Sequence, residues 1–144
     1  MKYKSYTEED TFNIAKEIGK KAKSGDIFCL IGDLGVGKTI FSKGFALGIG
    51  INDHITSPTF TIVQVYDNIL LPLYHFDMYR IEDSSELDYI GYEDYFFGNG
   101  ICLVEWANNV EDVIPKNSTW IYIDKDLNQG FDYRQILVSE RKLR

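Results

Sequence analysis

Residues 32–39 carry the side chains whose types and spacing point most directly to chemistry. They read GDLGVGKT and fit G-x-x-x-x-G-K-[ST], the pattern of a phosphate-binding P-loop. Glycines in such a loop let backbone N–H groups turn toward phosphate oxygens, and the helix that follows adds partial positive charge at its first turn. Lys38 is then placed to reach the β- and γ-phosphates of a nucleotide, and the Thr39 hydroxyl to take one Mg²⁺ coordination position.

The segments on either side agree with this interpretation. Residues 26–31 (DIFCLI) form an apolar run of strand length, and residues 39–47 (TIFSKGFAL) read as a helix. Strand, glycine loop and helix in this order is the setting that the motif requires. The nucleotide-contacting residues predicted here are Gly32, Asp33, Leu34, Gly35, Val36, Gly37, Lys38, Thr39 and Ile40.

A nucleotide-bound Mg²⁺ needs a further acidic residue, expected at the end of an apolar strand near the loop. Three carboxylates follow such runs: Asp77 after LYHF, Glu105 after ICLV and Asp124 after WIYI. Asp124 precedes Lys-Asp, which reads as a solvated turn, so it ranks last. Periodicity does not choose between Asp77 and Glu105, and both remain candidates for metal binding and catalysis.

Other polar and aromatic residues surround these carboxylates. Trp106 follows Glu105 directly, and a large ring there would keep water away from a bound γ-phosphate. Asp77 has His75, Tyr79 and Arg80 near it in the sequence. Each of these three could equally be a structural or surface residue.

Hydroxyl side chains cluster at residues 56–59, just before an extended segment. Pro58 disfavours helix at Ser57, so the chain turns here. Thr56, Ser57 and Thr59 would form either a switch-like loop that senses the γ-phosphate or simply a hydroxyl-rich turn.

The rest of the chain predicts an α/β fold: a three-layer, P-loop-like domain with a parallel core and antiparallel hairpin strands, spanning residues 1–144 as one domain. Thr7 would cap a helix whose apolar residues begin at Phe12, and Ser84 or Ser85 would cap an acidic helix over 86–97. Further strands are expected at 1–6, 59–66, 69–76, 101–104, 119–123 and 133–138. The strands at 59–66 and 69–76 would pair as a hairpin, and residues 108–113 would form one helical turn.

Composition limits the possible partners and compartments. The 144 residues carry a net charge of −7, which disfavours strong direct binding to nucleic acid. Cys29 and Cys102 lie in apolar runs without metal-ligand spacing, as expected for buried thiols in a reducing compartment. Neither a secretory leader pattern nor an apolar run of about 18 residues is present, so we expect a cytoplasmic protein that does not engage a membrane.

Arginine placement bears on the type of reaction. The four arginines are Arg80, Arg134, Arg141 and Arg144, too few near the loop for the lid and acceptor site of a small-molecule kinase. In the body of the chain only Arg80 could act as an arginine finger, so slow hydrolysis by the isolated chain is expected. A kinase and a nucleotide-dependent binding module with incidental hydrolysis remain the alternatives.

Four motifs occur in order: GDLGVGKT, SPTF, HFDMYR and ICLVEW. Together they resemble the TsaE (YjeE) family of bacterial P-loop ATPases, and the resemblance covers roughly residues 11–106. It implies ATP as substrate, Mg²⁺ as cofactor, and a role in forming threonylcarbamoyladenosine at position 37 of tRNAs that read ANN codons. It also implies action on a complex of TsaB-type and TsaD-type proteins, with tRNA engaged indirectly through that complex.

The resemblance also implies roles for single residues. Asp77 in HFDMYR matches a Walker B-like aspartate, Glu105 in VEW lies close to Mg²⁺ or the attacking water, and Trp106 lies beside it. Thr59 in SPTF, with Ser57, belongs to a switch-I-like loop. Two residues at the places of adenine-end contacts in the family are Thr11 and Arg134.

This sequence departs from the usual family pattern at three positions. Val36 stands where Ala is common, Ile40 where a second Thr is common, and Ala107 in place of a frequent Pro. None of these changes removes a phosphate-binding or metal-binding group.

Overall fold

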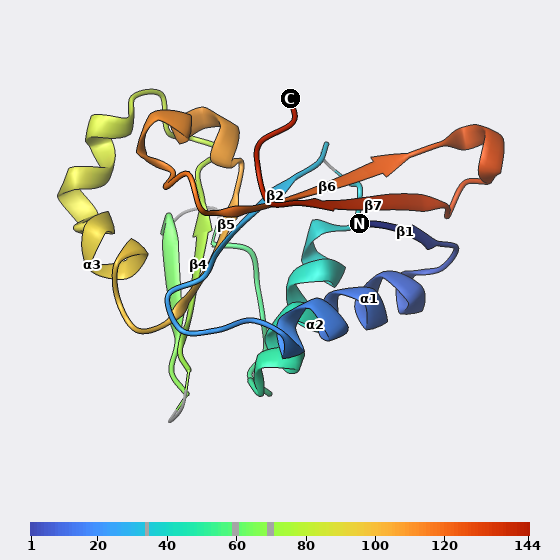
Figure 1. Ribbon diagram of the computed structural model, residues 1–144, viewed down its shortest axis with the longest axis horizontal. Helices are drawn as coiled ribbons and strands as arrows, with labels where there is room; N and C mark the ends of the chain where they lie inside the picture. The colour runs from blue at the N-terminus through green and yellow to red at the C-terminus, as the bar shows by residue number, and fades with distance from the viewer. Residues whose placement is uncertain (34, 59–60, 69–70) are drawn as a thin grey trace.

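A computed structural model describes residues 1–33, 35–58, 61–68 and 71–144, and these build a seven-stranded mixed sheet (Figure 1). The strand order is β1-β7-β6-β2-β5-β4-β3. The strands are β1 (Lys2–Ser5), β2 (Ile27–Ile31), β3 (Val63–Tyr66), β4 (Leu73–Asp77), β5 (Ile101–Glu105), β6 (Thr119–Lys125) and β7 (Arg134–Ser139). The helices are α1 (Glu8–Lys20), α2 (Lys38–Ile49) and α3 (Tyr92–Phe96), with 3₁₀ helices η1 (Ser84–Ile90), η2 (Ala107–Val113) and η3 (Leu127–Gln129).

The central strands are parallel and the outer pairs antiparallel, which confirms the predicted mixed sheet. Strand β2 pairs in parallel with β5 and β6, and β5 pairs in parallel with β4. The antiparallel pairs are β1–β7, β6–β7 and the β3–β4 hairpin. The carboxyl ends of β2, β4, β5 and β6 therefore meet at one edge of the sheet, and the glycine loop leaves from that edge.

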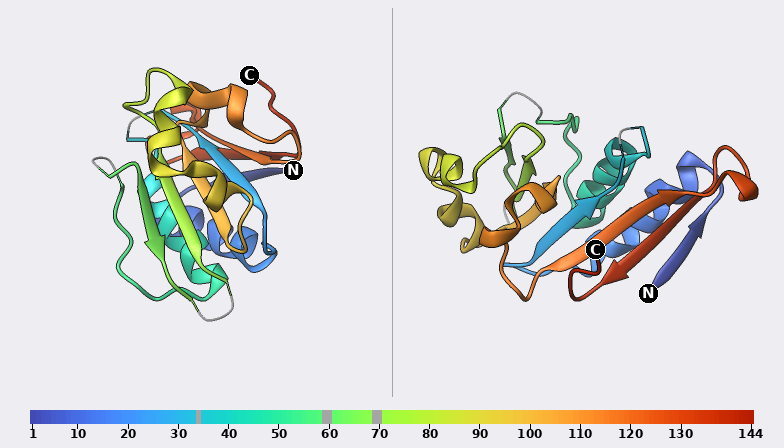
Figure 2. Two further views of the ribbon diagram at one scale, coloured as in Figure 1. Left: turned by 90° about the vertical axis from the view of Figure 1, so that its left-hand side faces the viewer. Right: turned by 90° about the horizontal axis from the view of Figure 1, so that it is seen from above.

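Both faces of the central sheet are buried, so its strands read as continuous apolar runs. On β2, Phe28 and Leu30 pack with residues of α1 and α2, whereas Ile27 and Cys29 pack with residues of η1, α3 and η2. The alternation places α1 and α2 on one face and the shorter helices on the other (Figure 2). This is the expected three-layer arrangement.

Helices α1 and α2 approach closely enough for their backbones to touch. A Cβ added to Gly44 would lie 2.2 Å from the carbonyl oxygen of Phe12, and one added to Gly48 would lie 2.2 Å from that of Lys16. Glycines at these crossings let α2 lie flat on α1. Because α2 begins at the glycine loop, this contact also fixes the direction of the loop.

The acidic helix predicted over 86–97 is wrong as one continuous element. It is divided into η1 and α3 at Gly91, whose φ of +66° lies in the left-handed region. The cap is also not a serine: the Asp83 side chain accepts from Ser85 N–H, and Glu86 bonds back to complete a capping box. Thr7 does cap α1 as predicted, accepting from Asp10 N–H at 3.0 Å.

Three strands, β3, β4 and β6, have a boundary that differs from the expected one by two residues or more. Strand β3 begins at Val63 because Ile62 N–H bonds to the Pro58 carbonyl in a turn, with an Ile62 φ of +66°. Strand β4 begins at Leu73, and the expected strand starts at Thr59 and Ile69 lie outside the described residues. Strand β6 continues to Lys125, so the turn expected directly after Asp124 is wrong: pairing with β7 extends the strand.

Cys29 and Cys102 are both buried, as predicted. Burial raises the pKa of the Cys102 thiol to about 12, and burial together with neighbouring Cys102 raises the pKa of Cys29 as well. Within the described ranges, no helix combines the length and apolar character needed to cross a bilayer.

The glycine crossing predicts that Gly44→Ala will lower the free energy of unfolding by about 1–3 kcal/mol, because the added methyl group overpacks against the Phe12 carbonyl. An open helical position would instead gain stability from this change. Urea denaturation measures the difference, and Lys43→Ala on the same helix should stay within about 0.5 kcal/mol of wild type. Equal stability of Gly44→Ala and wild type would contradict the close packing.

Candidate functional site

The glycine loop runs from β2 into α2 and keeps the geometry that its sequence predicts. Gly35 and Gly37 have φ values of +77° and +108°, which L side chains rarely adopt, and Gly37 is the N-cap residue of α2. Gly32 is needed for another reason: an added Cβ would lie 2.7 Å from Val36 Cγ1 and 3.0 Å from the Ile123 carbonyl oxygen. The loop is thus held close against the end of β6.

Lys38 is the first residue of α2, and its side chain is buried at 8% exposure. Its Nζ donates to the Gly32 carbonyl at 2.7 Å and lies 4.2 Å from the centroid of the Trp106 ring. Desolvation lowers the pKa of Lys38, while the negative charges of Glu105, Asp77 and Asp33 oppose that shift. A phosphate oxygen at this place would bind the Lys38 ammonium more strongly than the neutral Gly32 carbonyl does.

Asp77 and Glu105 end the neighbouring parallel strands β4 and β5 and occupy paired positions. Glu105 is also paired with Leu30 of the strand that leads into the glycine loop. Their exposures are 7% and 5%, so both are buried carboxylates. The structure brings together the two residues between which the sequence did not choose.

Each carboxylate is held by a different set of hydrogen bonds. Asp77 Oδ1 accepts from Tyr79 N–H at 3.0 Å, and Oδ2 accepts from the Ser57 hydroxyl at 3.3 Å. Glu105 Oε2 lies 2.6 Å from Nε2 of His75, which is 1% exposed. Ser57 thus connects the predicted switch-like segment to the site, whereas Thr59 lies outside the described residues.

Trp106 follows β5 with a left-handed backbone, at φ +58°, that turns its ring over Lys38. The Tyr79 ring packs against it with a centroid separation of 4.9 Å. Two bonds hold the strand ends together: Met78 N–H to the Glu105 carbonyl, and Asn109 Nδ2 to the Met78 carbonyl, both 3.0 Å. The Trp106 ring therefore covers the Lys38 ammonium, and Tyr79 packs against the ring.

These groups share one cavity of about 380 Å³. It is lined by Gly35, Gly37, Lys38, Thr39, Ile40, Ser57, Asp77, Tyr79, Glu105 and Trp106. The predicted metal and catalytic residues thus lie together with Gly35, Gly37 and Ile40 of the loop, whereas Gly32, Asp33 and Val36 do not line this cavity and Leu34 lies outside the described residues. Arg80 is exposed, and His75 reaches the cavity only through Glu105.

Thr11 and Arg134 lie together at a second cavity, of about 240 Å³, on the other side of the loop residues Gly35–Gly37. Arg134 Nε donates to the Val36 carbonyl at 2.8 Å, so the arginine braces the loop from outside. The Thr11 hydroxyl is bonded to that of Ser5 at 2.7 Å. The geometry agrees with a site beside the phosphates but gives Thr11 a structural partner.

Several further residues line this second cavity without having been predicted, namely Thr7, Glu8, Lys125, Phe131 and Asp132. Phe131 and Asp132 come from the β6–β7 connection and Lys125 from the end of β6, which the antiparallel pairing of β7 with β1 and β6 brings beside the start of α1. Phe131 is 78% exposed there. Local sequence gives no signal for this, because the contact depends on strand pairing between distant segments.

Gly32 and Asp33 line a third cavity, of about 370 Å³, behind the loop. Asp124 also lines it and forms an ion pair with Arg144. Asp33 and Asp124 therefore line a different cavity from Asp77 and Glu105, and Trp106 lies in the walls of both.

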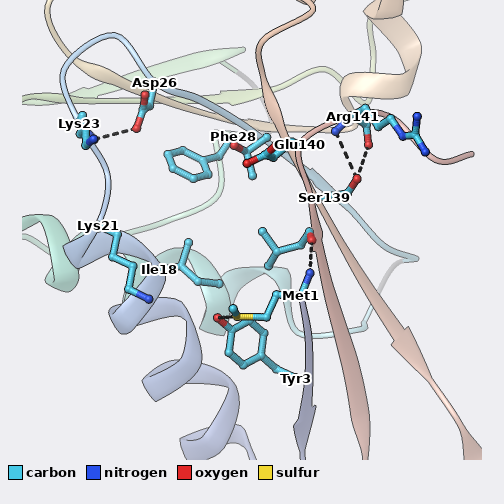
Figure 3. Close-up of a pocket in the computed structure, with 12 residues that line it drawn as sticks. Met1, Tyr3, Ile18, Lys21, Lys23, Asp26, Phe28, Ser139, Glu140 and Arg141 are labelled. Carbon is cyan, nitrogen blue, oxygen red and sulfur yellow. Dashed lines mark hydrogen bonds between the residues drawn. The ribbon is translucent and has the colours of Figure 1, made fainter.

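The largest described cavity, about 930 Å³, lies elsewhere (Figure 3). Its walls include Met1, Phe28 and Thr119, near the amino ends of β2 and β6 and thus at the opposite edge of the sheet from the glycine loop. Cavity size alone would therefore place the functional site away from the glycine loop. The buried charged side chains and the loop backbone instead favour the 380 Å³ cavity.

The donor set of the 380 Å³ cavity fits Mg²⁺. Two carboxylates and the Thr39 hydroxyl supply hard oxygen ligands, which this ion prefers. Among the residues described, no group of three or more His, Cys, Asp or Glu side chains is arranged to hold a metal. A magnesium ion would thus share its coordination with phosphate oxygens and water, as is usual for nucleotide-bound Mg²⁺.

Fold and site together define an α/β protein of P-loop-like architecture. The family model for "Threonylcarbamoyl adenosine biosynthesis protein TsaE" matches residues 5–136. The chain therefore belongs to the TsaE family, and the resemblance seen in its motifs is confirmed.

Individual relatives agree with this assignment. The "tRNA threonylcarbamoyladenosine biosynthesis protein TsaE" of Bacillus subtilis is 47% identical over 136 residues, covering 94% of this chain and 83% of the relative. The protein of the same name from Treponema pallidum is 38% identical, covering 84% and 89%. The crystal structure of Bacillus subtilis YdiB superposes with a TM-score of 0.80 at 41% identity, covering 97% of this chain and 85% of that one.

The contact between Lys38 and Trp106 predicts a spectroscopic response. Magnesium nucleotide should draw the ammonium toward phosphate and so give a saturable change in tryptophan emission. Trp120, the other tryptophan, is buried in β6, so Trp120→Phe should keep the response and Trp106→Phe should lose it. A response that survives Trp106→Phe would contradict this arrangement.

Proposed function

We propose that this protein is a Mg²⁺-dependent ATPase that supports threonylcarbamoyladenosine formation at position 37 of tRNAs reading ANN codons. It would do so by acting on a complex of TsaB-type and TsaD-type proteins in the cytoplasm. The observation that carries the proposal is the convergence of Lys38, Asp77 and Glu105 on one cavity at a glycine loop, in a chain that belongs to the TsaE family.

The phosphates would bind at the loop and the first turn of α2. Gly37 is the N-cap of the 12-residue helix α2 and makes no side-chain cap bond, so the first N–H groups of the helix would be available to phosphate oxygens. Lys38 would exchange its bond to the Gly32 carbonyl for a charged oxygen, which is the stronger interaction.

Thr39 and Asp77 would hold Mg²⁺, directly or through water. The bound ion would neutralise charge that develops on the phosphate oxygens. Hydrogen bonds from Tyr79 N–H and the Ser57 hydroxyl orient Asp77 for this role. A shift of the Ser57 segment would therefore change the position of a metal ligand.

Glu105 would orient the attacking water and accept its proton. It is buried at 5% exposure beside Trp106, and a water-poor site strengthens electrostatic interactions with the reacting groups. Trp106, with Tyr79 packed against it, would limit access of bulk water from the same side.

Adenine would lie in the cavity between Thr11 and Arg134, on the far side of the loop from the carboxylates. Arg134 would then act partly through the Val36 carbonyl, by keeping the loop in shape. With a net charge of −7, the chain is suited to leave tRNA binding to its partner complex.

Comparison of ATP turnover by the chain alone and with a TsaB/TsaD-type complex tests this function. We expect slow hydrolysis by the chain alone and faster hydrolysis with the complex. Lys38→Ala removes the ammonium at the phosphates, so this variant should hydrolyse ATP under neither condition. Turnover of 1–100 s⁻¹ that requires a small-molecule acceptor would instead identify a kinase. Nucleotide-dependent binding with no gain in hydrolysis would identify a binding module.

Glu105→Ala should lower the hydrolysis rate by about 100-fold or more while ATP affinity changes only a few-fold, because a general base acts in the transition state. Rates come from phosphate release and affinities from calorimetry. Asp124→Ala offers a matched control, since this carboxylate ends β6 but lines a different cavity. A parallel loss of affinity and rate in Glu105→Ala would favour plain metal binding.

A further inference from the structure

His75 is buried at 1% exposure, yet it makes a single described side-chain contact of a polar kind. Its Nε2 lies 2.6 Å from Glu105 Oε2, and its Nδ1 is buried without a described hydrogen-bond partner. A buried polar atom that lacks a partner destabilises the fold. Stability alone would therefore favour an apolar side chain at this position.

The strand geometry explains why His75 reaches Glu105. His75 and Asp77 are two residues apart on β4, so they project from the same face of the sheet. His75 pairs with Leu103 and Asp77 with Glu105 across the parallel β4–β5 ladder. The imidazole is thus a diagonal neighbour of Glu105 and approaches it from within the sheet, away from the cavity.

The two carboxylates are engaged differently by the protein. Both oxygens of Asp77 accept described hydrogen bonds, from Tyr79 N–H and from Ser57. In Glu105, the described bond goes to Oε2 alone. A carboxylate held through one oxygen keeps its orientation and leaves the other available to a ligand.

We propose that His75 is a positioning residue for hydrolysis: it donates through Nε2 to Glu105 Oε2 and so reserves Oε1 for the attacking water. His75 does not touch the substrate, since it lies behind Glu105 and not among the residues lining the cavity. The division of labour follows: Asp77, with both oxygens held, serves Mg²⁺ through a fixed network, and Glu105 serves the water.

This inference rests on the proposed ATPase function, because it assigns a step of that reaction. A positioning role and a structural role predict different effects of substituting His75. If His75 only fills the core, its substitution would change the free energy of unfolding but not the rate of hydrolysis relative to ATP affinity. A residue that orients Glu105 would change the rate of hydrolysis and leave ATP binding intact.

His75→Leu and His75→Gln separate the two roles. Leucine fills the space without a donor, whereas the glutamine amide nitrogen lies near the position of Nε2 and can donate to Glu105. We expect His75→Leu to lower kcat roughly 10- to 100-fold with the Kd for Mg-ATP almost unchanged, and His75→Gln to recover most of the rate. Thermal unfolding should show both variants folded.

Tyr74→Phe is the matched control on the same strand. Tyr74 projects from the opposite face of β4 and packs edge-on against Tyr95, so loss of its hydroxyl should leave kcat unchanged. If His75→Leu does not fold, His75→Asn replaces it: its amide is the same as that of glutamine but one methylene too short to reach Glu105.

Three results would overturn the inference. The first is an unchanged kcat in His75→Leu, or in His75→Asn where that variant replaces it, and the second is a His75→Gln variant that is equally slow. The third is a loss of ATP affinity equal to the loss of rate. Each can be read only if wild type binds and hydrolyses ATP under the same conditions. Wild type that does neither would refute the proposed function itself, so the two failures are distinguishable.

Discussion

The burial of one ammonium beside two carboxylates at a single sheet edge is the constraint on which the site depends. Lys38, Asp77 and Glu105 are 8%, 7% and 5% exposed, and an isolated charge at such a depth would be strongly unfavourable. Desolvation does lower the pKa of Lys38, but the carboxylates oppose that shift. The parallel register of β2, β5 and β4 brings the glycine loop and the two carboxylates to the same end of the sheet.

The surrounding structure holds this arrangement from two sides. Glycines at the crossing of α1 and α2 fix the helix that presents Lys38, and the bond from Asn109 to the Met78 carbonyl ties the segments after β4 and β5 together. Arg134 braces the loop through the Val36 carbonyl. A nucleotide would therefore meet a site whose backbone is already formed, and ordering costs on binding would be small.

Features encoded locally could be predicted from the sequence. The glycine loop, its strand and its helix occupy consecutive residues, and Asp77 and Glu105 were found because each ends an apolar run. The split at Gly91 was missed since a left-handed glycine inside an otherwise helical pattern gives little warning. The contact of His75 with Glu105 could not be predicted, because it depends on the register between β4 and β5, which a single sequence does not supply.

Titration calorimetry of the purified protein with ATP and magnesium tests the central claim most directly. The account predicts saturable binding at one site per chain, strengthened by magnesium because Thr39 and Asp77 would hold the ion beside the phosphates. Absence of binding heat for any nucleoside triphosphate, at several temperatures and with the partner complex added, would contradict it.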